Sequence, residues 1–295
     1  MNEPMNEPVT TTLPEQPTEV HAGKHAAPAG THSALHSPKK SAKDRIWLVS
    51  LLVCIAVFLF SAWQLFSYWR EGQTSDNYVS DLADQTVTVK PTQKPSSDAA
   101  LPQKETAPIE VDFAALQAQN SDVVAWLYCA DTPINYPVAR ADDNAKYLHT
   151  LLDGTHNQNG TLFMDFRNAA DYSDRNTIIY GHNMKSGKMF GTLDQYKKQE
   201  YYDQHPVWYL LTPQGAYKVE LAAGWVTQDT DPLYNQPADE ENITALLKAA
   251  DRRSTFASGI TLTAEDEIVT FSTCSYENET ARYVLVGRMI PLDAE

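Results

Sequence analysis

The chain has 295 residues and a formal net charge of −15 at pH 7. The charge is unevenly distributed, because residues 1–70 carry six Lys/Arg against five Asp/Glu, whereas residues 71–295 carry 17 against 33. A strongly acidic domain repels phosphate backbones, so we expect no nucleic-acid partner. The chain has only 3 cysteines, which excludes a disulfide-dense scaffold and predicts free thiols.

Residues 1–45 are predicted to be a disordered tail. They open with a duplicated MNEP, are rich in Pro, Thr, Ala and His, and contain almost no large apolar residues. Such a segment cannot bury enough apolar surface to offset the entropy of ordering. Its histidines are irregularly spaced, which favours a solvated tail over a metal site.

Residues 46–69 are predicted to be a single transmembrane helix. The run Ile46–Phe66 is apolar except for Ser50, Ser61 and Gln64, and about 20 apolar residues cross a bilayer. A cleaved signal peptide is disfavoured, because the apolar run is too long and no A-x-A site follows it. The basic residues cluster before the span, which puts the N-terminus in the cytoplasm and the C-terminal bulk outside the cell; they are Lys39, Lys40, Lys43 and Arg45.

Residues 70–108 are predicted to be an extracellular linker, since 90–108 is rich in Pro, Ser and Lys. We expect one domain over 109–295. Its predicted helices cover 111–120 (with Asp112 as N-cap), 142–152, 188–204 and 239–252. Its predicted strands cover 123–129, 134–140, 161–166, 176–180, 206–212, 217–227, 260–263, 267–273 and 281–289. Roughly eight short strands with helices in the connections indicate a mainly β fold, a mixed β-barrel.

Three residues at predicted strand ends carry candidate chemistry: His182, Cys274 and Arg282. A cysteine beside an imidazole and a guanidinium can be a thiolate at working pH. The thiolate would attack a carbonyl, and the imidazolium would protonate the leaving amine. The guanidinium does not give up its proton, but it can stabilise an oxyanion. The other cysteine outside the span, Cys129, lies in a predicted strand, where we expect it to pack as a small apolar residue.

We expect no metal and no cofactor. Zinc ligands usually come in close pairs, and neither C-x-x-C nor H-E-x-x-H occurs. The acidic loops 171–174 and 229–231 do not follow the EF-hand pattern. A phosphate-binding P-loop and a G-x-G-x-x-G fingerprint are absent as well.

The motifs around these residues resemble those of sortases. The segment Thr270–Cys274, TFSTC, is similar to the family's T-L-x-T-C signature with Phe271 in place of Leu, and Arg282 opens the following strand, RYVLVG, where sortases carry their catalytic arginine. The segment YGHNM at 180–184, followed by MFG at 189–191, resembles the histidine segment of class B sortases. Further class B resemblances are INYPV at 134–138, Asp143-Asn144 with Tyr147-Leu148, FMDFRN at 163–168, and the helix at 239–252 before the cysteine strand.

The resemblance covers about residues 109–292 and implies an eight-stranded sortase barrel with transpeptidase activity. Cys274 would cleave a C-terminal sorting signal after Thr and form a thioacyl enzyme. His182 would protonate the leaving amine, and Arg282 would stabilise the oxyanion. The acceptor would be an amine of a lipid-linked peptidoglycan precursor or of a pilin, at the outer face of a Gram-positive-type cell membrane. By position, the expected substrate-binding residues are Asn144, Leu148, Tyr180 and Ser272.

Three other interpretations remain. An extracellular cysteine peptidase would pass the acyl group to water, although papain-like enzymes place Cys before His in the chain and here His182 comes first. The L,D-transpeptidases also use Cys and His, but their S-x-G-C-x-R pattern is absent. A binding module that kept the fold without activity is disfavoured, because all three catalytic candidates are present.

Overall fold

The computed structural model describes residues 41–90, 105–275 and 279–292. The predicted tail at 1–45 therefore lies almost entirely outside the described residues, and so does the middle of the predicted linker. Residues Val57–Glu295 form one compact unit of the chain.

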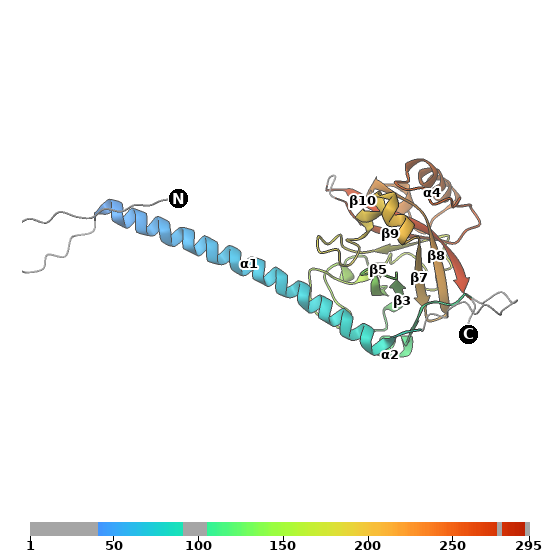
Figure 1. Cartoon of the computed structure of the whole chain (residues 1–295), viewed down its shortest axis with the longest axis horizontal. Coiled ribbons are helices and arrows are strands. Elements are labelled where there is room, and N and C mark those ends of the chain that lie inside the picture. Colours follow the sequence, from blue (N-terminus) through green and yellow to red (C-terminus); the bar gives the residue numbers. More distant parts are fainter. Residues whose placement is uncertain (1–40, 91–104, 276–278, 293–295) are drawn as a thin grey trace, which may run out of the picture. The chain divides into compact units, whose positions relative to one another are not determined.

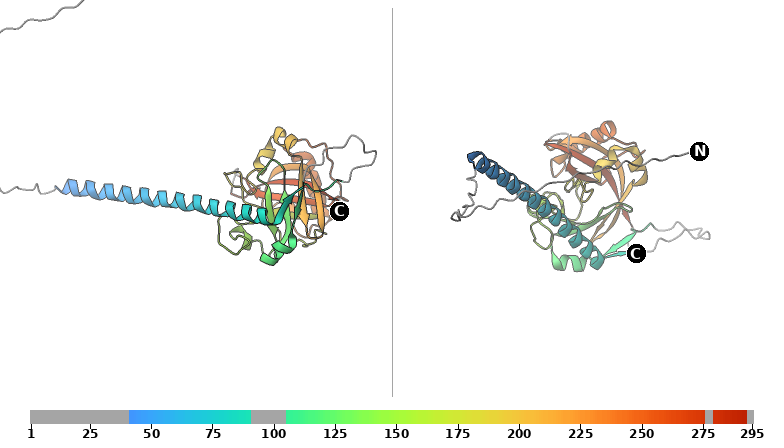
Figure 2. Two further views of the ribbon diagram at one scale, coloured as in Figure 1. Left: turned by 60° about the horizontal axis from the view of Figure 1, so that its bottom comes forward. Right: turned by 60° about the vertical axis from the view of Figure 1, so that its left-hand side comes forward.

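Eight strands close into a barrel in the order β10-β8-β7-β3-β4-β5-β6-β9 (Figure 1). The pairs β4–β5 and β6–β9 are parallel, and the other pairs are antiparallel. Figure 2 shows the orange and red strands of the C-terminal half side by side in the barrel wall. The predicted mixed β-barrel is confirmed. The strands are β3 Val123–Tyr128, β4 Asn135–Ala139, β5 Leu162–Met164, β6 Asn176–Tyr180, β7 Val207–Thr212, β8 Gly215–Gln228, β9 Ile268–Cys274 and β10 Ala281–Leu292.

Large aromatic and aliphatic side chains fill the barrel core. Trp208 and Phe271 are fully buried with ring centroids 4.6 Å apart, and Phe190 meets Phe271 edge to face. Strand β9 is buried along its length until its last residue, Cys274, which is exposed. Because all the remaining residues of β9 are buried, the strand holds the thiol at its end on a rigid support.

Two of the predicted helices form much as expected. Helix α2, Phe113–Gln119, begins after Asp112, whose carboxylate accepts a hydrogen bond from the Ala115 N–H at 2.9 Å. Helix α4, Glu240–Arg253, begins with a capping box between Asp239 and Asn242. Such caps satisfy N–H groups that have no partner within the helix. The remaining short helices are η1 Lys146–Leu148, η2 Leu193–Lys197, α3 Gln199–Gln204 and η3 Pro232–Tyr234.

Two expectations for single elements were wrong. The helix predicted at 142–152 is only the 3₁₀ turn η1, because Asp143 accepts the N–H groups of both Ala145 and Lys146 and holds a local turn. The strand predicted at 260–263 does not form. There the Ile260 N–H donates to the hydroxyl of Ser258 at 3.0 Å, so a side chain takes the donor that a neighbouring strand would have used.

Helix α1 runs from Ala42 to Thr86 and is longer than the predicted span. It contains an 18-residue window of mean hydropathy 2.5, long and apolar enough to be a candidate membrane anchor. Its last turns continue into β1, Val87–Val89, which pairs antiparallel with β2, Ile109–Val111. Leu82 is 3 % exposed. The first part of the predicted linker is therefore ordered and packed on the domain.

Candidate active site

Strand register places the candidate catalytic groups on one face of the barrel wall. Arg282 on β10 lies directly opposite Cys274 on β9 in an antiparallel pair, and side chains at such positions share a face of the sheet. On the other side of β9, Tyr180 of β6 pairs in parallel with Ser272. Because side chains alternate along a strand, Ser272 shares the face of Cys274. His182 follows Tyr180 by two residues.

A cavity of about 460 Å³ opens at this face. Every site residue expected from the sequence lines it: Asn144, Leu148, Tyr180, His182, Ser272, Cys274 and Arg282. Three further lining residues, to which the sequence assigned no role in the site, are Arg167, Asp229 and Tyr234. The structure thus brings together segments that are more than 100 residues apart in the chain, from Asn144 to Arg282.

The His182 ring is held by two neighbours. Its Nε2 lies 2.7 Å from the carbonyl oxygen of Leu148. A carbonyl can only accept, so Nε2 carries a proton, and in the neutral ring Nδ1 is the basic nitrogen. The ring also stacks on His149 with centroids 5.6 Å apart. Burial lowers the pKa of His182 below its usual 6.5. The hydrogen bond to Leu148 would raise this pKa, but burial, together with the smaller effect of His149, outweighs that bond.

The backbone around His182 is equally constrained. The Phe190 N–H donates to the His182 carbonyl at 3.0 Å, and the Thr273 hydroxyl donates to the Gly181 carbonyl at 2.7 Å. A Cβ at Gly181 would come within 2.4 Å of Leu162 and 2.7 Å of Phe190, so only glycine fits there without displacement. Close packing at position 181 therefore determines where the chain presents His182.

An asparagine links the histidine segment to the cysteine strand. The Asn183 side chain donates to the carbonyl oxygen of Cys274 at 2.7 Å and to Asp194 at 2.8 Å. The histidine segment and the cysteine strand are therefore joined by a direct hydrogen bond, although 91 residues separate the two partners. The sequence reasoning quoted Asn183 only as part of a motif. No local signal indicates this contact, because it forms only when two distant strands meet.

The Arg282 guanidinium is fixed by groups on its own loop and on the turn that follows β8. It donates to the carbonyls of Ala281 at 3.0 Å and Glu279 at 3.3 Å, and it pairs with the Asp229 carboxylate at 3.5 Å. The side chains of Arg282 and Asp229 are 25 % and 39 % exposed. A partly exposed pair of this kind contributes little to stability, so its main effect is to orient the guanidinium at the cavity.

The two remaining thiols differ from Cys274 in their surroundings. Cys129 is 1 % exposed, and burial raises its pKa to about 11, as expected for a cysteine that packs as an apolar residue. Cys54 lies in the apolar part of α1. Among the described residues, Cys274 is therefore the exposed thiol that lies in a cavity of the domain.

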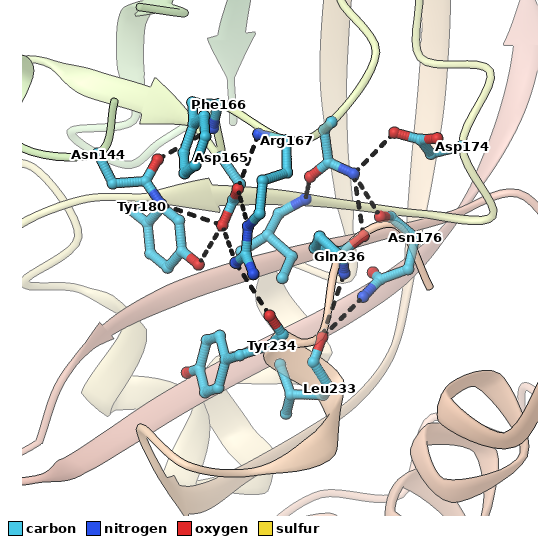
Figure 3. A network of polar contacts seen from close by, with 12 residues as sticks. Asn144, Asp165, Phe166, Arg167, Asp174, Asn176, Tyr180, Leu233, Tyr234 and Gln236 are labelled. Atoms are coloured by element: carbon cyan, nitrogen blue, oxygen red, sulfur yellow. Dashed lines mark hydrogen bonds and ion pairs between the residues drawn. The ribbon is translucent and has the colours of Figure 1, made fainter. Parts of the chain in front are cut away.

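A buried carboxylate is hydrogen-bonded to three residues that line this cavity (Figure 3). Asp165 is 0 % exposed and accepts hydrogen bonds from the Tyr180 hydroxyl at 2.9 Å and the Asn144 amide at 3.1 Å. Arg167 donates to both of its oxygens, at 2.8 and 2.7 Å. Burial alone would raise the pKa of Asp165, but the hydrogen bonds from Arg167 and Tyr180 outweigh it and lower the pKa below its usual value.

The same network reaches the β8–α4 connection. Arg167 also donates to the Tyr234 carbonyl at 3.0 Å, and the Tyr234 hydroxyl is 2.7 Å from the hydroxyl of Ser272. The rings of Tyr234 and Tyr180 stack with centroids 6.3 Å apart. The polar groups of Asn144 and Tyr180 are thus engaged in hydrogen bonds within the protein. These residues therefore present their remaining surface, above all the ring of Tyr180, to the cavity.

Asp165 and Arg167 entered the sequence analysis only as part of the FMDFRN motif, because their contacts with Tyr180 and Tyr234 form only when distant segments meet. The described residues contain no group of three or more His, Cys, Asp or Glu that could hold a metal ion. The functional groups that line the cavity include a thiol, an imidazole, guanidinium groups, carboxylates and hydroxyl groups.

Comparison with known proteins agrees with this site. The model of the sortase domain matches residues 129–290. Sortase B of Listeria monocytogenes is 32 % identical over 243 residues, which cover 81 % of this chain and 94 % of the relative. A Staphylococcus aureus sortase B–substrate complex is 31 % identical with a TM-score of 0.58, covering 61 % of this chain and 85 % of that one.

A sortase B structure complexed with triglycine is also 31 % identical, has a TM-score of 0.56 and covers 61 % of this chain and 86 % of that one. The residues that the sortase domain model matches include both β9, which carries the cysteine, and the segment that carries the histidine. The chain therefore belongs to the sortase family and is a class B sortase, a cysteine transpeptidase.

Proposed function

We propose that Cys274 is the nucleophile, His182 the general acid and base, and Arg282 the oxyanion-stabilising residue of this transpeptidase. The observation that supports the proposal most strongly is the register of β9 and β10, which puts Arg282 directly opposite Cys274. His182 lines the same cavity. A thiolate nucleophile, a proton donor and a fixed cation are the three groups that acyl transfer requires.

The first half-reaction cleaves the substrate peptide bond. The basic Nδ1 of His182 takes the proton of the Cys274 thiol, which gives a thiolate and an imidazolium. The thiolate adds to the carbonyl carbon of a threonine, and the carbonyl oxygen becomes an oxyanion that the Arg282 guanidinium stabilises. The tetrahedral intermediate collapses as the C–N bond breaks. His182 donates its Nδ1 proton to the leaving amine, while Nε2 keeps its proton on the Leu148 carbonyl. The product is a thioester at Cys274.

The second half-reaction transfers the acyl group. An incoming amine loses a proton to His182 and attacks the thioester, and the thiolate leaves. Arg282 stabilises the second oxyanion as it did the first. The imidazolium then returns its proton to the Cys274 thiolate, which restores the starting protonation state. This order of steps requires that the same cavity bind first the substrate peptide and then the acceptor amine.

The substrate would be a surface protein with a C-terminal sorting signal, cleaved after Thr. The acceptor would be an amine of a lipid-linked peptidoglycan precursor or of a pilin. Support comes from two similar proteins, since one structure of S. aureus sortase B contains a substrate and a sortase B structure contains triglycine. Asn144, Leu148, Tyr180 and Ser272 would contact the sorting signal from the cavity wall.

The apolar part of α1 would anchor the enzyme as a single-pass protein of the cell membrane. Its hydropathy and length support a membrane span. The lysines and arginine that precede the span support a cytoplasmic N-terminus and an extracellular catalytic domain. That topology would put the cavity on the side where exported substrates and wall precursors are found, in a Gram-positive-type envelope.

Hydrolysis by the same site is the second candidate activity, because water can replace the amine in the second half-reaction. The test uses the full chain in detergent micelles with a sorting-signal peptide, with and without triglycine. The proposal predicts an amide product with triglycine, and its loss in Cys274→Ala. Release of the free acid alone, at every triglycine concentration, would identify a peptidase instead. Peptide binding without cleavage would identify a binding module.

A further inference from the structure

The part of α1 from Glu71 to Thr86 is packed on the domain through one helical face. The residues of that face recur at spacings of three and four: Glu71, Ser75, Tyr78, Val79, Leu82 and Thr86. Ser75, Leu82 and Thr86 are 2, 3 and 4 % exposed. Residues at such spacings lie on one side of a helix. A face this deeply buried is a structural contact and not a flexible tether.

The first segment under this face is the loop 149–161, which follows Leu148. The Asn157 side chain donates to the Glu71 carbonyl of α1 at 2.9 Å, and the Asn157 N–H donates to the His149 carbonyl at 2.9 Å. Tyr78 lies beside Asp153 of the same loop, and burial followed by the Asp153 charge raises the pKa of Tyr78 to about 12. Leu148 and His149 are the two residues that hold the His182 ring.

The second segment under this face is the loop 183–190, which follows His182. Val79 packs against the core cluster that includes Met189, and Val79 and Met189 line one small crevice with Leu151 and Leu152. Asp76 lies 4.0 Å from the ammonium of Lys188. This loop is closed by a bridge between Asn183 and Met189 and returns to His182 through the Phe190 N–H.

We propose that residues 71–82 of α1 are a positioning element of the active site, which holds the loops 149–161 and 183–190 together and thereby sets the position of the His182 ring. The helix touches both segments that fix the imidazole, one through Asn157 and the other through Met189. None of its own side chains lines the catalytic cavity. The inference rests on the proposed role of His182 as the proton donor. It adds that the helix entering the membrane span is part of the catalytic architecture.

Under this proposal, the rate of acyl transfer depends on how α1 packs against the two loops. A displacement of about 1 Å in a catalytic group can cost on the order of 100-fold in rate. Loosening the two loops would also let water reach His182, and its pKa would then rise toward the usual value. The ionisable group against the ring is His149, and the helix variants leave it in place. They also leave unchanged the other ionisable residues that line the cavity, which are Arg167, Tyr180, Asp229, Asp231, Tyr234, Cys274 and Arg282.

The experiment compares a core-facing double variant, Val79→Ala with Leu82→Ala, with the matched pair Asn77→Ala and Ser80→Ala on the exposed side of the same helix. All are full-length proteins in micelles, and each is checked by thermal unfolding. We expect kcat for transfer to fall roughly 10-fold or more in the core-facing variant with KM little changed, and the His182 pKa, read by NMR titration, to rise. Val79→Ile should retain activity.

The inference is overturned if the folded core-facing variant keeps the wild-type kcat and His182 pKa, or if the exposed pair loses as much activity. If the double variant is unfolded at the assay temperature, Val79→Ala alone is judged by the same criteria. Cys274→Ala is measured alongside. Transfer by Cys274→Ala would contradict the proposed function itself, whereas an inactive Cys274→Ala beside unaffected helix variants would contradict the helix inference alone.

Discussion

His182 donates its Nε2 proton to the carbonyl oxygen of Leu148 across 2.7 Å. This bond determines which ring nitrogen is available for the proposed proton transfer, and its acceptor is a backbone carbonyl, which does not titrate. The carbonyl belongs to the end of η1, which Asp143 holds in place by accepting two backbone N–H groups. The tautomer of the proposed acid is therefore set by a turn 34 residues earlier in the chain.

The tautomer can be observed directly. We expect neutral His182 to carry its proton on Nε2, with Nδ1 showing the ¹⁵N shift of an unprotonated nitrogen. Its pKa should lie below 6.5, because burial disfavours the imidazolium. A long-range ¹H–¹⁵N correlation spectrum across a pH titration measures both. A neutral ring that carries its proton on Nδ1 and none on Nε2 would contradict the assignment of Nδ1 as the nitrogen that exchanges protons.

The same lowered pKa has a consequence for stability. In the window just below pH 6.5 the unfolded chain binds more protons at His182 than the folded chain does, so stability falls as the pH drops through it. Replacing the ring by an uncharged side chain removes this contribution. His182→Gln should therefore lose less free energy of unfolding than the wild type between about pH 7 and about pH 5. Urea unfolding at the two pH values measures the difference, and an equal loss in both proteins would contradict it.

The barrel and the catalytic candidates could be predicted from sequence for a physical reason. A residue such as Cys274 ends a strand whose other residues are all buried, and alternation together with apolar content reveals such a strand locally. The contacts that complete the site could not be predicted in this way. Asn183 reaches the Cys274 carbonyl and Arg167 reaches the Tyr234 carbonyl only after distant segments have met.

The extent of α1 was missed for a related reason. Its last turns have apolar residues only on one face, and a short run of that kind after a membrane span reads as the start of a linker. For a local reason, the strand predicted at 260–263 does not form. Its residues suit a strand by propensity, but the Ser258 hydroxyl captures the Ile260 N–H, which is a local competition that propensity does not describe.

Replacing Arg282 should lower the rate of catalysis strongly and the stability of the fold only slightly. We expect Arg282→Ala to lower kcat by roughly 100- to 1,000-fold, about 2.7–4 kcal/mol, as for removal of an oxyanion donor. Its ion pair with Asp229 is partly exposed, so the loss of stability should stay below about 1 kcal/mol. Arg288→Ala is the matched control on the same strand, because Arg288 pairs with Glu220 outside the cavity. An equal loss of rate in both variants would argue against the oxyanion role.

The Asp165–Arg167 pair should control acid stability. Removing Arg167 leaves a fully buried carboxylate with fewer donors, so the pKa of Asp165 should rise. A carboxyl whose folded pKa lies below the unfolded 3.8 stabilises the fold above that pH, and this contribution is lost as the pH falls through the folded pKa. Arg167→Ala should therefore unfold at a higher pH than the wild type in an acid titration followed by circular dichroism. An unchanged midpoint would mean that Tyr180 and Asn144 suffice to hold the charge.

The thiols should differ sharply in reactivity. In a Cys54→Ser background, iodoacetamide at about pH 8 should alkylate Cys274 and spare Cys129, which is buried and has a pKa of about 11. Peptide mapping after a timed reaction gives the ratio of the two adducts. Comparable labelling of Cys129 in the folded protein would show that the β3 end of the barrel opens on the time scale of the reaction.

The central claim is that Cys274 carries the acyl group between donor and acceptor, and intact-protein mass spectrometry tests it most directly. The full chain is mixed with a sorting-signal peptide without triglycine and quenched in acid at short times. We predict one adduct on Cys274, whose added mass equals that of the peptide fragment ending in its threonine less one water, and which is discharged when triglycine is added. An acyl adduct on another residue, or the same adduct on Cys274→Ala, would contradict the account.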